Sequence, residues 1–240
     1  MDGIRSVAVV TFPGSNGDHD ALHSLSEDLG FESHLVDYRA TNLDAYDAVI
    51  LPGGFSYGDA LRAGAIARFS PIMPAIREFA AGGKPVLGIC NGFQVLCEAH
   101  LLPGALLRNK SLQFHCFWTH IRIENVESSW TRDLAEGVLL RLPVAHGEGA
   151  YFTDAAGLAE LESNGQIVAR YANRQGEIDD ASNPNGSLAG IAAISNVAGN
   201  VVGLMPHPER ATNSLVGGED GRRILQHIAN VATGSITVFV

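Results

Sequence analysis

The sequence predicts an α/β protein with a mostly parallel sheet, to which an antiparallel part is added. Up to Pro103, short apolar runs alternate with segments of helical periodicity, the order typical of parallel βαβ units. After Pro103, short strand-like segments follow one another with turns between them. The chain has 240 residues, 46% of them hydrophobic, which suits one domain spanning residues 1–240 with a sizeable core.

The first half contains four apolar runs, most of which end at glycine, proline or a polar residue. Strands buried in a parallel sheet have this composition, because both of their faces are covered. Between the runs lie segments with helical spacing of apolar residues. We therefore expect strands at residues 7–12, 35–36, 48–51 and 85–89, and helices at residues 18–29, 71–81 and 91–99.

The second half predicts the antiparallel part. We expect short strands here, a hairpin turn at residues 196–200, an exposed loop at residues 183–187 and a final helix at residues 219–231. The expected strands lie at residues 105–107, 111–123, 138–144, 167–171, 191–195 and 201–205.

Composition excludes several classes of function. The formal net charge is −10, with 26 acidic against 16 basic side chains, which is unlike a protein that follows nucleic-acid phosphates. No run of about 18 apolar residues could span a membrane. The three cysteines and the lack of a signal-peptide pattern favour reduced thiols and a cytoplasmic location. No His/Cys cluster has the spacing of a zinc site, so we expect no metal.

The strongest local signal is the segment Gly88-Ile89-Cys90-Asn91-Gly92-Phe93-Gln94. An apolar strand leads into Cys90, a helix follows, and glycines stand two residues before and after the thiol, as in a nucleophile elbow. The helix N-terminus would stabilise a thiolate. A buried core cysteine is the alternative, and the two glycines make it the weaker one. For Cys97 and Cys116 we expect the ordinary core role.

A thiol nucleophile needs a base, and Pro206-His207-Pro208-Glu209 follows an apolar strand. In extended chain, residues two apart point the same way, so His207 and Glu209 can face one site and Glu209 can orient the imidazole. Paired glycines at Gly53-Gly54, also at a strand end, could offer backbone N–H groups to an oxyanion, together with the N–H of Asn91. Taken alone, the Pro206–Glu209 motif is also compatible with a surface loop, and the Gly53-Gly54 motif with a plain turn.

At these three motifs the chain resembles the class I glutamine amidotransferases. Further matching segments run from near residue 10 to near residue 225, so the resemblance covers nearly the whole chain. They are Pro13–Asn16, Leu51–Asp59, Arg62–Ala67, Leu102–Ala105, Arg108-Asn109, Pro143–Gly149, Asn183–Ser187 and Pro206–Arg210.

The resemblance implies a flavodoxin-like sheet with helices on both faces and assigns roles to the motifs. Cys90 would attack the amide carbon of glutamine, His207 would transfer the proton and Glu209 would orient it. Backbone N–H groups of Gly53, Gly54 and Asn91 would hold the oxyanion. Gln94 is implied to help bind glutamine, and His146 with Gly147 to bind its α-amino-acid end.

Within this family the chain is most similar to short glutaminase subunits of de novo purine biosynthesis. Their ammonia goes to a large synthetase subunit, which uses ATP and Mg and converts formylglycinamide ribonucleotide to formylglycinamidine ribonucleotide. A small bridging subunit completes the complex. The resemblance thus implies no cofactor on this chain, and the sequence lacks a phosphate-binding Gly-x-x-x-x-Gly-Lys-Ser/Thr loop.

Two other interpretations compete with this one. Stress hydrolases and chaperones with an elbow cysteine share the sheet, but they lack the His-Pro-Glu motif and usually place a carboxylate near the cysteine. A scaffold that only binds a synthetase could have lost its nucleophile. Cys90, His207, Glu209 and Gln94 are all present, which favours the amidotransferase.

Overall fold

A nine-stranded mixed sheet runs through the molecule, in the order β2-β1-β3-β4-β11-β10-β9-β6-β7. The computed structural model describes residues 6–226. The first five strands in this order are parallel, and the remaining four continue the same sheet with antiparallel pairing. The α/β class and the antiparallel elaboration are as expected.

Four of the five strands in the parallel part, all except β2, are short apolar runs. Val7 to Val10 and all four residues of β3 and of β4 are buried, as required of strands covered on both faces. The bounds are Ser6–Thr11 (β1), Glu32–Asp37 (β2), Ala48–Leu51 (β3), Val86–Ile89 (β4) and Val201–Leu204 (β11).

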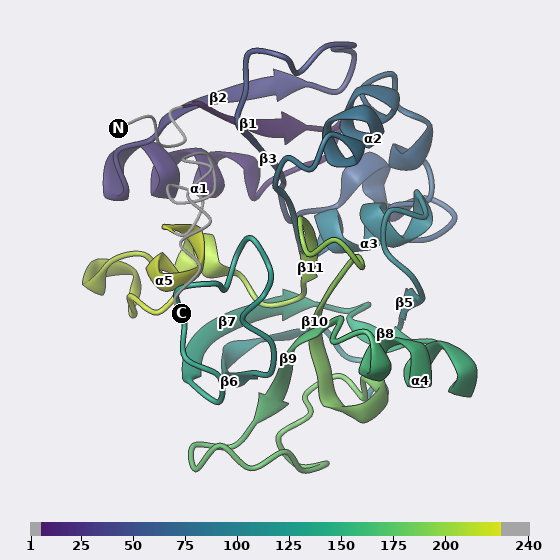
Figure 1. The fold of residues 1–240 in the computed structure, drawn as a ribbon, viewed down its shortest axis with the longest axis vertical. Helices are drawn as coiled ribbons and strands as arrows, with labels where there is room; N and C mark the ends of the chain where they lie inside the picture. The colour runs from purple at the N-terminus through teal and green to yellow at the C-terminus, as the bar shows by residue number, and fades with distance from the viewer. Residues whose placement is uncertain (1–5, 227–240) are drawn as a thin grey trace, which may run out of the picture.

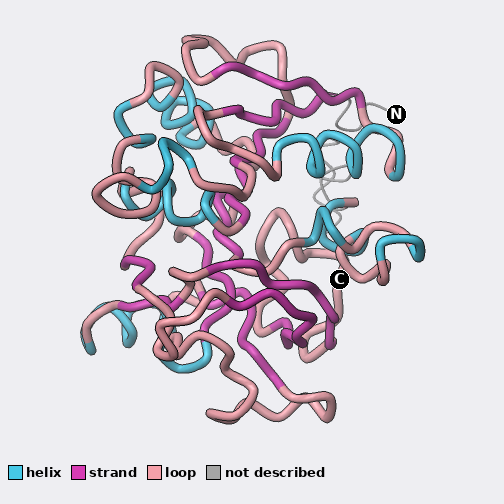
Figure 2. Tube along the Cα trace, turned by 180° about the vertical axis from the view of Figure 1, so that it is seen from behind, coloured by secondary structure: helices cyan, strands magenta, loops and turns pink. Residues whose placement is uncertain are grey.

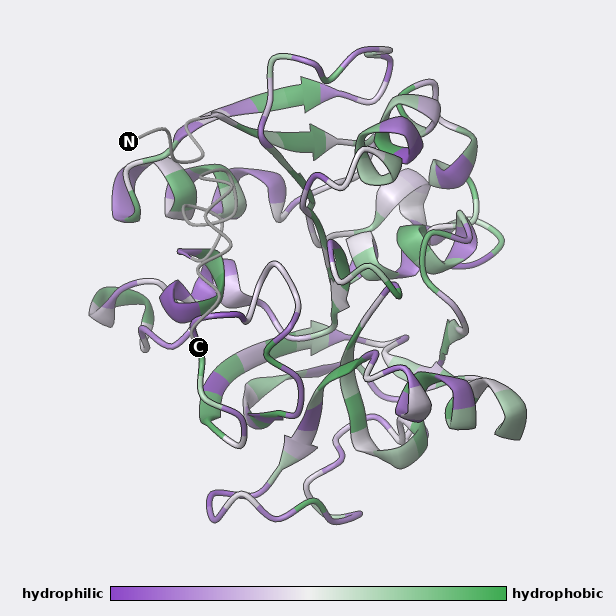
Figure 3. Cartoon of the chain, in the orientation of Figure 1, coloured by the Kyte–Doolittle hydropathy of each residue, from purple (hydrophilic) through white to green (hydrophobic). Residues whose placement is uncertain are grey.

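Helices cover both faces of this parallel part. Helix α1 (Asp18–His23) and the short α5 (Arg222–Leu225) lie on one side, while α2 (Met73–Ala81) and α3 (Asn91–Glu98) lie on the other, as the two opposite views show (Figures 1 and 2). Hydrophobic residues follow the strands at the centre, whereas polar residues predominate on the outer turns (Figure 3). The expectation of a sheet covered on both faces is therefore confirmed.

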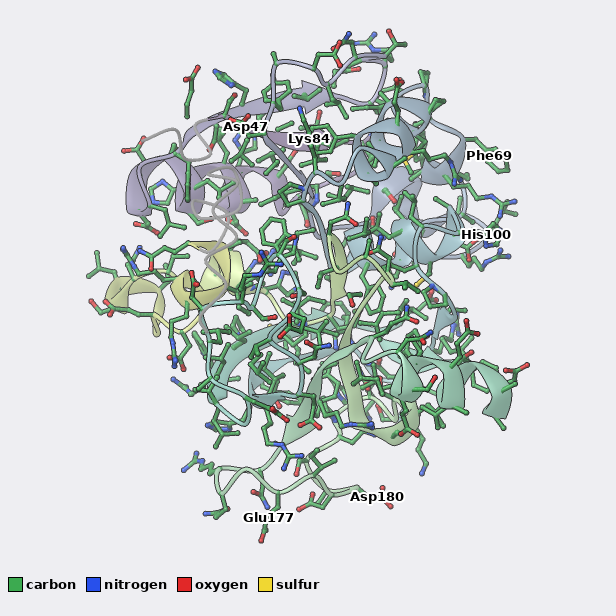
Figure 4. The ribbon with its side chains drawn as sticks, in the orientation of Figure 1. Asp47, Phe69, Lys84, His100, Glu177 and Asp180 are labelled. Atoms are coloured by element: carbon green, nitrogen blue, oxygen red, sulfur yellow. The ribbon has the colours of Figure 1, made fainter. Side chains whose placement is uncertain are left out.

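Four neighbouring strands beyond β11 make up the antiparallel part of the sheet. Its strands are β10 (Ile191–Ser195), β9 (Ile167–Ala172), β6 (His115–Ile123) and β7 (Leu139–His146). A separate two-stranded sheet joins β5 (Ala105–Leu107) to β8 (Ala150–Phe152). The loop between β9 and β10 carries the exposed Glu177 and Asp180 at the end of the molecule farthest from β2 (Figure 4).

Several expected boundaries were wrong. β6 begins at His115 rather than at residue 111, because Leu112 adopts a left-handed φ of 59° and its N–H bonds to Asn109 O in a turn. β8 and helix α4 (Ala155–Ser163) were not expected from the sequence, although Asp154 caps α4 by accepting from Gly157 N at 2.7 Å. The final helix is seen at Arg222–Leu225, and the expected part beyond residue 226 lies outside the described residues.

The strand order brings three chain segments to one edge of the sheet. β3, β4 and β11 are neighbours and parallel, so their carboxyl ends lie side by side. The loops after them contain Gly53-Gly54, Cys90 and His207. Ligands of open α/β sheets bind outside these strand ends, so the three loops mark the place for a functional site.

Candidate active site

Cys90 occupies a strained turn between β4 and α3. Its φ is 49° and its ψ is −102°, a conformation that costs energy for any residue with a side chain. The turn is held because Cys90 N donates to Leu204 O of β11 at 2.8 Å. Strain held by neighbouring structure is characteristic of a nucleophile elbow.

The two glycines of this turn are required by close backbone packing. A Cβ on Gly92 would lie 1.9 Å from Leu51 O, and one on Gly88 would lie 2.6 Å from the Gly92 carbonyl. Helix α3 therefore rests directly on β3 and β4. This contact fixes where the helix begins, and with it the position of the Cys90 sulfur.

The Cys90 side chain lies beside β7, and the residue is 5% exposed. Its Sγ is 3.7 Å from the carbonyl oxygen of Ala145, which can accept a hydrogen bond from the thiol. Cys97 is also buried, and burial raises the pKa of its thiol far above the ordinary value. Cys116 was expected in the core but is exposed.

His207 and Glu209 form a buried pair next to the elbow. His207 Nδ1 donates to Glu209 Oε1 at 2.6 Å, and the two side chains are 2% and 1% exposed. The backbone of His207 is held as well, because its N–H donates to Pro143 O of β7 at 2.8 Å. The expectation that both side chains face one site agrees with this geometry.

The charge state of His207 follows from its neighbours. Burial lowers the pKa of His207, but the negative charges of Glu209 and Cys90 outweigh that effect and raise it to about 10. The imidazole is therefore protonated at neutral pH. Because Nδ1 is bonded to Glu209, the interaction with the Cys90 side chain that also raises this pKa involves Nε2, which therefore lies on the side of the thiol.

Gly53 lies against the His207 ring, and Gly54 lies against the Ser15-Asn16 segment. A Cβ on Gly53 would lie 2.7 Å from His207 Cε1 and 3.5 Å from Cys90 Cβ, so these three residues surround one point. Gly54 has a φ of 134° and faces the backbone of Asn16, and Gly53 O accepts from Gly17 N at 3.1 Å. No hydrogen bond within residues 6–226 engages the N–H of Gly53, Gly54 or Asn91. Gly53 and Asn91 are buried and Gly54 is half-buried, and a buried backbone N–H without a partner is rare in proteins.

The side chain of Asn91 connects the elbow to the glycine loop. Its Oδ1 accepts from Ser56 N at 3.1 Å, while its Nδ2 donates to Asp59 Oδ1 at 3.1 Å and to Gln94 Oε1 at 2.8 Å. Gln94 Nε2 in turn donates to Glu148 O. Burial and the nearby charge of Glu148 raise the pKa of Asp59 to about 6.

His146 ends β7 and is buried beside the same site. Its Nδ1 lies 3.1 Å from Asn109 Oδ1, and its ring packs against Gly149. Gly147 O accepts from Asn109 N at 2.9 Å, so the turn is fixed. No role in the chemistry was expected for Asn109, Ala145 or Asp59, although all three stand in segments that the family resemblance singled out.

A cavity of about 550 Å³ borders this site on the side of Glu209. Ala145, Glu209, Arg210, Trp118 and the exposed Cys116 contribute to its wall. In the described part of the chain, no three His, Cys, Asp or Glu side chains are arranged to hold a metal ion. No helix among the described residues is long and apolar enough to cross a membrane.

Comparison with known proteins identifies the class that this fold and site define. Residues 5–219 match the family described as the CobB/CobQ-like glutamine amidotransferase domain. A glutamine amidotransferase from Thermotoga maritima shares the fold, with a TM-score of 0.56 at 17% identity over 87% of this chain and 77% of that one. The chain is thus a glutamine amidotransferase and therefore an enzyme.

Two further comparisons are more specific. The phosphoribosylformylglycinamidine synthase subunit PurQ of Thermomicrobium roseum is 59% identical over 224 residues, which cover 93% of this chain and 95% of the relative. A chain in the structure of PurLQS from Thermotoga maritima matches with a TM-score of 0.84 at 43% identity, over 95% of this chain and 98% of that one. The chain therefore belongs to the PurQ family of phosphoribosylformylglycinamidine synthase subunits.

Proposed function

We propose that this chain hydrolyses glutamine with Cys90 as nucleophile, His207 as acid and base, and Glu209 as the residue that orients His207. The observation that carries the proposal is the strained Cys90 elbow beside the buried His207–Glu209 pair. The Cys90 thiolate attacks the amide carbon of glutamine, and protonated His207 gives its Nε2 proton to the leaving nitrogen. Ammonia leaves and a glutamyl thioester remains on Cys90.

Water completes the cycle. His207, now neutral, takes a proton from water as the oxygen attacks the thioester, and the Cys90 sulfur leaves as a thiolate. Glutamate is released and His207 is again protonated. Glu209 favours this protonated state through its 2.6 Å hydrogen bond and its charge.

We assign oxyanion stabilisation to the backbone N–H groups of Gly53, Gly54 and Asn91. Their lack of partners within residues 6–226 supports the assignment, because donors that are not engaged elsewhere are free to bind an oxyanion. Gln94, His146 and Gly147 are proposed to bind the glutamine. Gln94 and His146 are buried next to the elbow, which supports this assignment.

We further propose the partners and the reaction served. The similarity to the PurQ subunits and to a chain of PurLQS supports assembly into phosphoribosylformylglycinamidine synthase with two other subunits, a large synthetase and a small bridging chain. ATP and Mg would act on the synthetase, which converts formylglycinamide ribonucleotide to formylglycinamidine ribonucleotide in purine biosynthesis. We expect this chain to work as one domain in the cytoplasm, without nucleic acid or membrane. The continuous sheet supports the single domain, and the unpaired cysteines support the cytoplasm.

We propose that binding of the synthetase partner activates the site by moving the Gly53-Gly54 loop, which brings an oxyanion donor into place. Cys90 is almost covered, while Phe55, next to the glycine loop, stacks on Phe114 with ring centroids 6.4 Å apart. Phe114 in turn lies close to Gly147, so the two exposed rings lie beside the turn that follows His146. Beside them, Tyr57 and Asp59 hold left-handed φ values of 54° and 52°. Docking on these exposed rings could move the loop, as interface cores are often aromatic.

The proposal is tested by measuring glutamate release from the chain alone and from the chain with synthetase, small bridging chain, ATP and formylglycinamide ribonucleotide. We expect slow turnover alone and a rise of about 10²–10³-fold in the complex, the effect of one oxyanion donor brought into place. An equal rate for the chain alone and for the complex would refute activation by a partner. Absence of glutamate release in both would refute the glutaminase itself.

A further inference from the structure

The buried side chain of Asn91 has one orientation. Ser56 N is a backbone donor, so the Asn91 atom that lies 3.1 Å from it is the acceptor Oδ1. Nδ2 then donates to Asp59 Oδ1 at 3.1 Å and to Gln94 Oε1 at 2.8 Å, which uses both of its hydrogens. Asn91 is 2% exposed, so water has little access to these three bonds. The side chain therefore connects the start of α3 to the chain that follows the paired glycines.

The chain that follows the paired glycines is strained. Tyr57, Asp59 and Leu61 have left-handed φ values of 54°, 52° and 71°, although none of them is glycine. Such conformations cost energy and persist only where surrounding contacts impose them. Leu61 is 91% exposed, so the packing of its own side chain does not impose its conformation. Contacts made by other residues of this segment must hold it.

One face of α3 provides many of these contacts. Asn91, Gln94 and Glu98 stand three and four residues apart, so they share a face of the helix. A Cβ on Gly64 would lie 2.8 Å from the carbonyl carbon of Gln94, which shows that the backbone of the segment rests directly on the helix. Arg62 Nε and Nη2 donate to the two carboxylate oxygens of Glu98 at 2.5 and 2.7 Å. The helix that begins at the nucleophile therefore carries residues 56–64.

The paired glycines lie between two anchored points. Before them is the end of β3, and after them is Ser56, whose N–H is held by Asn91. A Cβ on Gly53 would lie 2.7 Å from His207 Cε1 and 3.5 Å from Cys90 Cβ, so a small shift of the loop changes its distance to both. The hydrogen bond to Ser56 N thus helps to set where the glycine loop lies relative to the reacting groups.

We infer that Asn91 acts through its side chain as a positioning residue, which fixes the far end of the Gly53-Gly54 loop against the nucleophile helix. The inference rests on the proposed glutaminase function. This role differs from that proposed for the backbone N–H of Asn91, because the side chain acts through Ser56 and Asp59 and not on the reacting atoms. Without the carboxamide, Ser56 N loses its acceptor, and the strained segment is free to relax and to take the glycine loop with it.

The main variant, Asn91→Ala, removes the carboxamide and keeps the backbone N–H. Ser70→Ala is the matched control, because Ser70 Oγ lies 3.0 Å from Tyr57 Oη and so binds the same strained segment without involving Asn91. The first readout is hydrogen–deuterium exchange of the peptide covering residues 51–60, in the chain alone. The second is kcat and KM for glutamate release, in the complex with the synthetase and the small bridging chain.

We expect Asn91→Ala to speed exchange in this peptide by at least about 10-fold and to leave exchange in β4 and β11 unchanged. In the complex, kcat should fall by about 10–100-fold and KM should change by less than about 3-fold, because Gln94 Nε2 is still held by Glu148 O. Ser70→Ala should keep kcat within about 2-fold of the unchanged complex.

Three results would overturn the inference. Unchanged exchange in Asn91→Ala would show that its side chain does not hold the loop. Faster exchange with unchanged kcat would show that the position of the loop does not govern turnover. A rise in KM alone would show that Asn91 acts through Gln94 on glutamine binding. If the unchanged complex releases no glutamate, the proposed glutaminase function fails, whereas the exchange experiment still tests the hold on the loop.

Asp59 provides a second test that leaves α3 intact. Asp59→Asn keeps an oxygen that can accept from Asn91 Nδ2, whereas Asp59→Ala removes the acceptor. We expect Asp59→Ala to lower kcat by about 3–10-fold and Asp59→Asn to stay within about 2-fold of the unchanged complex. In the Asn91→Ala background, Asp59→Ala should cost little more, because the bond is already gone. Equal kcat in the two Asp59 variants, or full additivity with Asn91→Ala, would contradict a role of Asn91 through Asp59.

Discussion

The substitution Gly53→Ala tests the geometry of the site with a single methyl group. Gly53 has no left-handed φ, so alanine can adopt its backbone conformation. The new Cβ would lie 2.7 Å from His207 Cε1, whereas ordinary contact begins at 3.4 Å. The ring must therefore move by about 0.7 Å, the difference between these two distances. Glu209 holds the ring through Nδ1, and Pro143 O holds the backbone N–H of the same residue.

This movement displaces the acid and base relative to Cys90. Misplacement by about 1 Å can cost about 10²-fold in rate, so we expect kcat of the complex to fall by roughly 30–100-fold. Overpacking costs about 1–3 kcal/mol of stability, so the variant should still fold. Glutamate release at saturating glutamine measures the effect.

Gly82→Ala is the matched control. Gly82 lies at the end of α2, also lacks a left-handed φ, and its Cβ would meet Phe79 O at an ordinary 3.4 Å. It should leave kcat unchanged. If Gly53→Ala folds and turns over glutamine at the rate of the control, the close approach of Gly53 to His207 does not govern catalysis and the reasoning is refuted.

Three other predictions concern charge and reactivity. Cys90→Ser should abolish glutamine-dependent synthesis by the complex but preserve synthesis from ammonium salts. A glutamine-like electrophile should label Cys90, and peptide mapping that finds the label on Cys97 or Cys116 instead would count against Cys90 as nucleophile. His207→Ala should be nearly inactive, whereas Glu209→Gln, which keeps a hydrogen-bonding group, should retain measurable turnover. In Glu209→Gln, the pH above which activity declines should be lower than in the unchanged chain. Equal turnover by the two variants would argue against different roles for His207 and Glu209. The pKa of Asp59 is raised, so its ionisation opposes folding as the pH rises from about 4 through about 6. Asp59→Asn should therefore stabilise the chain above pH 6 by about 1–3 kcal/mol and have little effect at pH 4, and thermal unfolding that shows the same difference at both pH values would contradict this.

The sequence alone predicted the parts of the fold that depend on local pattern. Continuous apolar runs indicated β1, β3 and β4, since strands covered on both faces need no polar side. The glycines around Cys90 indicated the elbow, because only glycine permits the contact between α3 and Leu51 O. The sequence also supplied the amidotransferase resemblance, which the family comparison confirms.

The tertiary structure decided the features that depend on distant segments. The antiparallel strands continue the main sheet, and β7 reaches the site only because β6 pairs with it over residues His115 to Arg122. That pairing places Ala145 O beside Cys90 Sγ and fixes the position of His146. No local pattern determines such contacts, because they join residues 55 positions apart in the chain. The contact between His146 Nδ1 and Asn109 Oδ1 joins residues 37 positions apart, so the sequence could not predict it either.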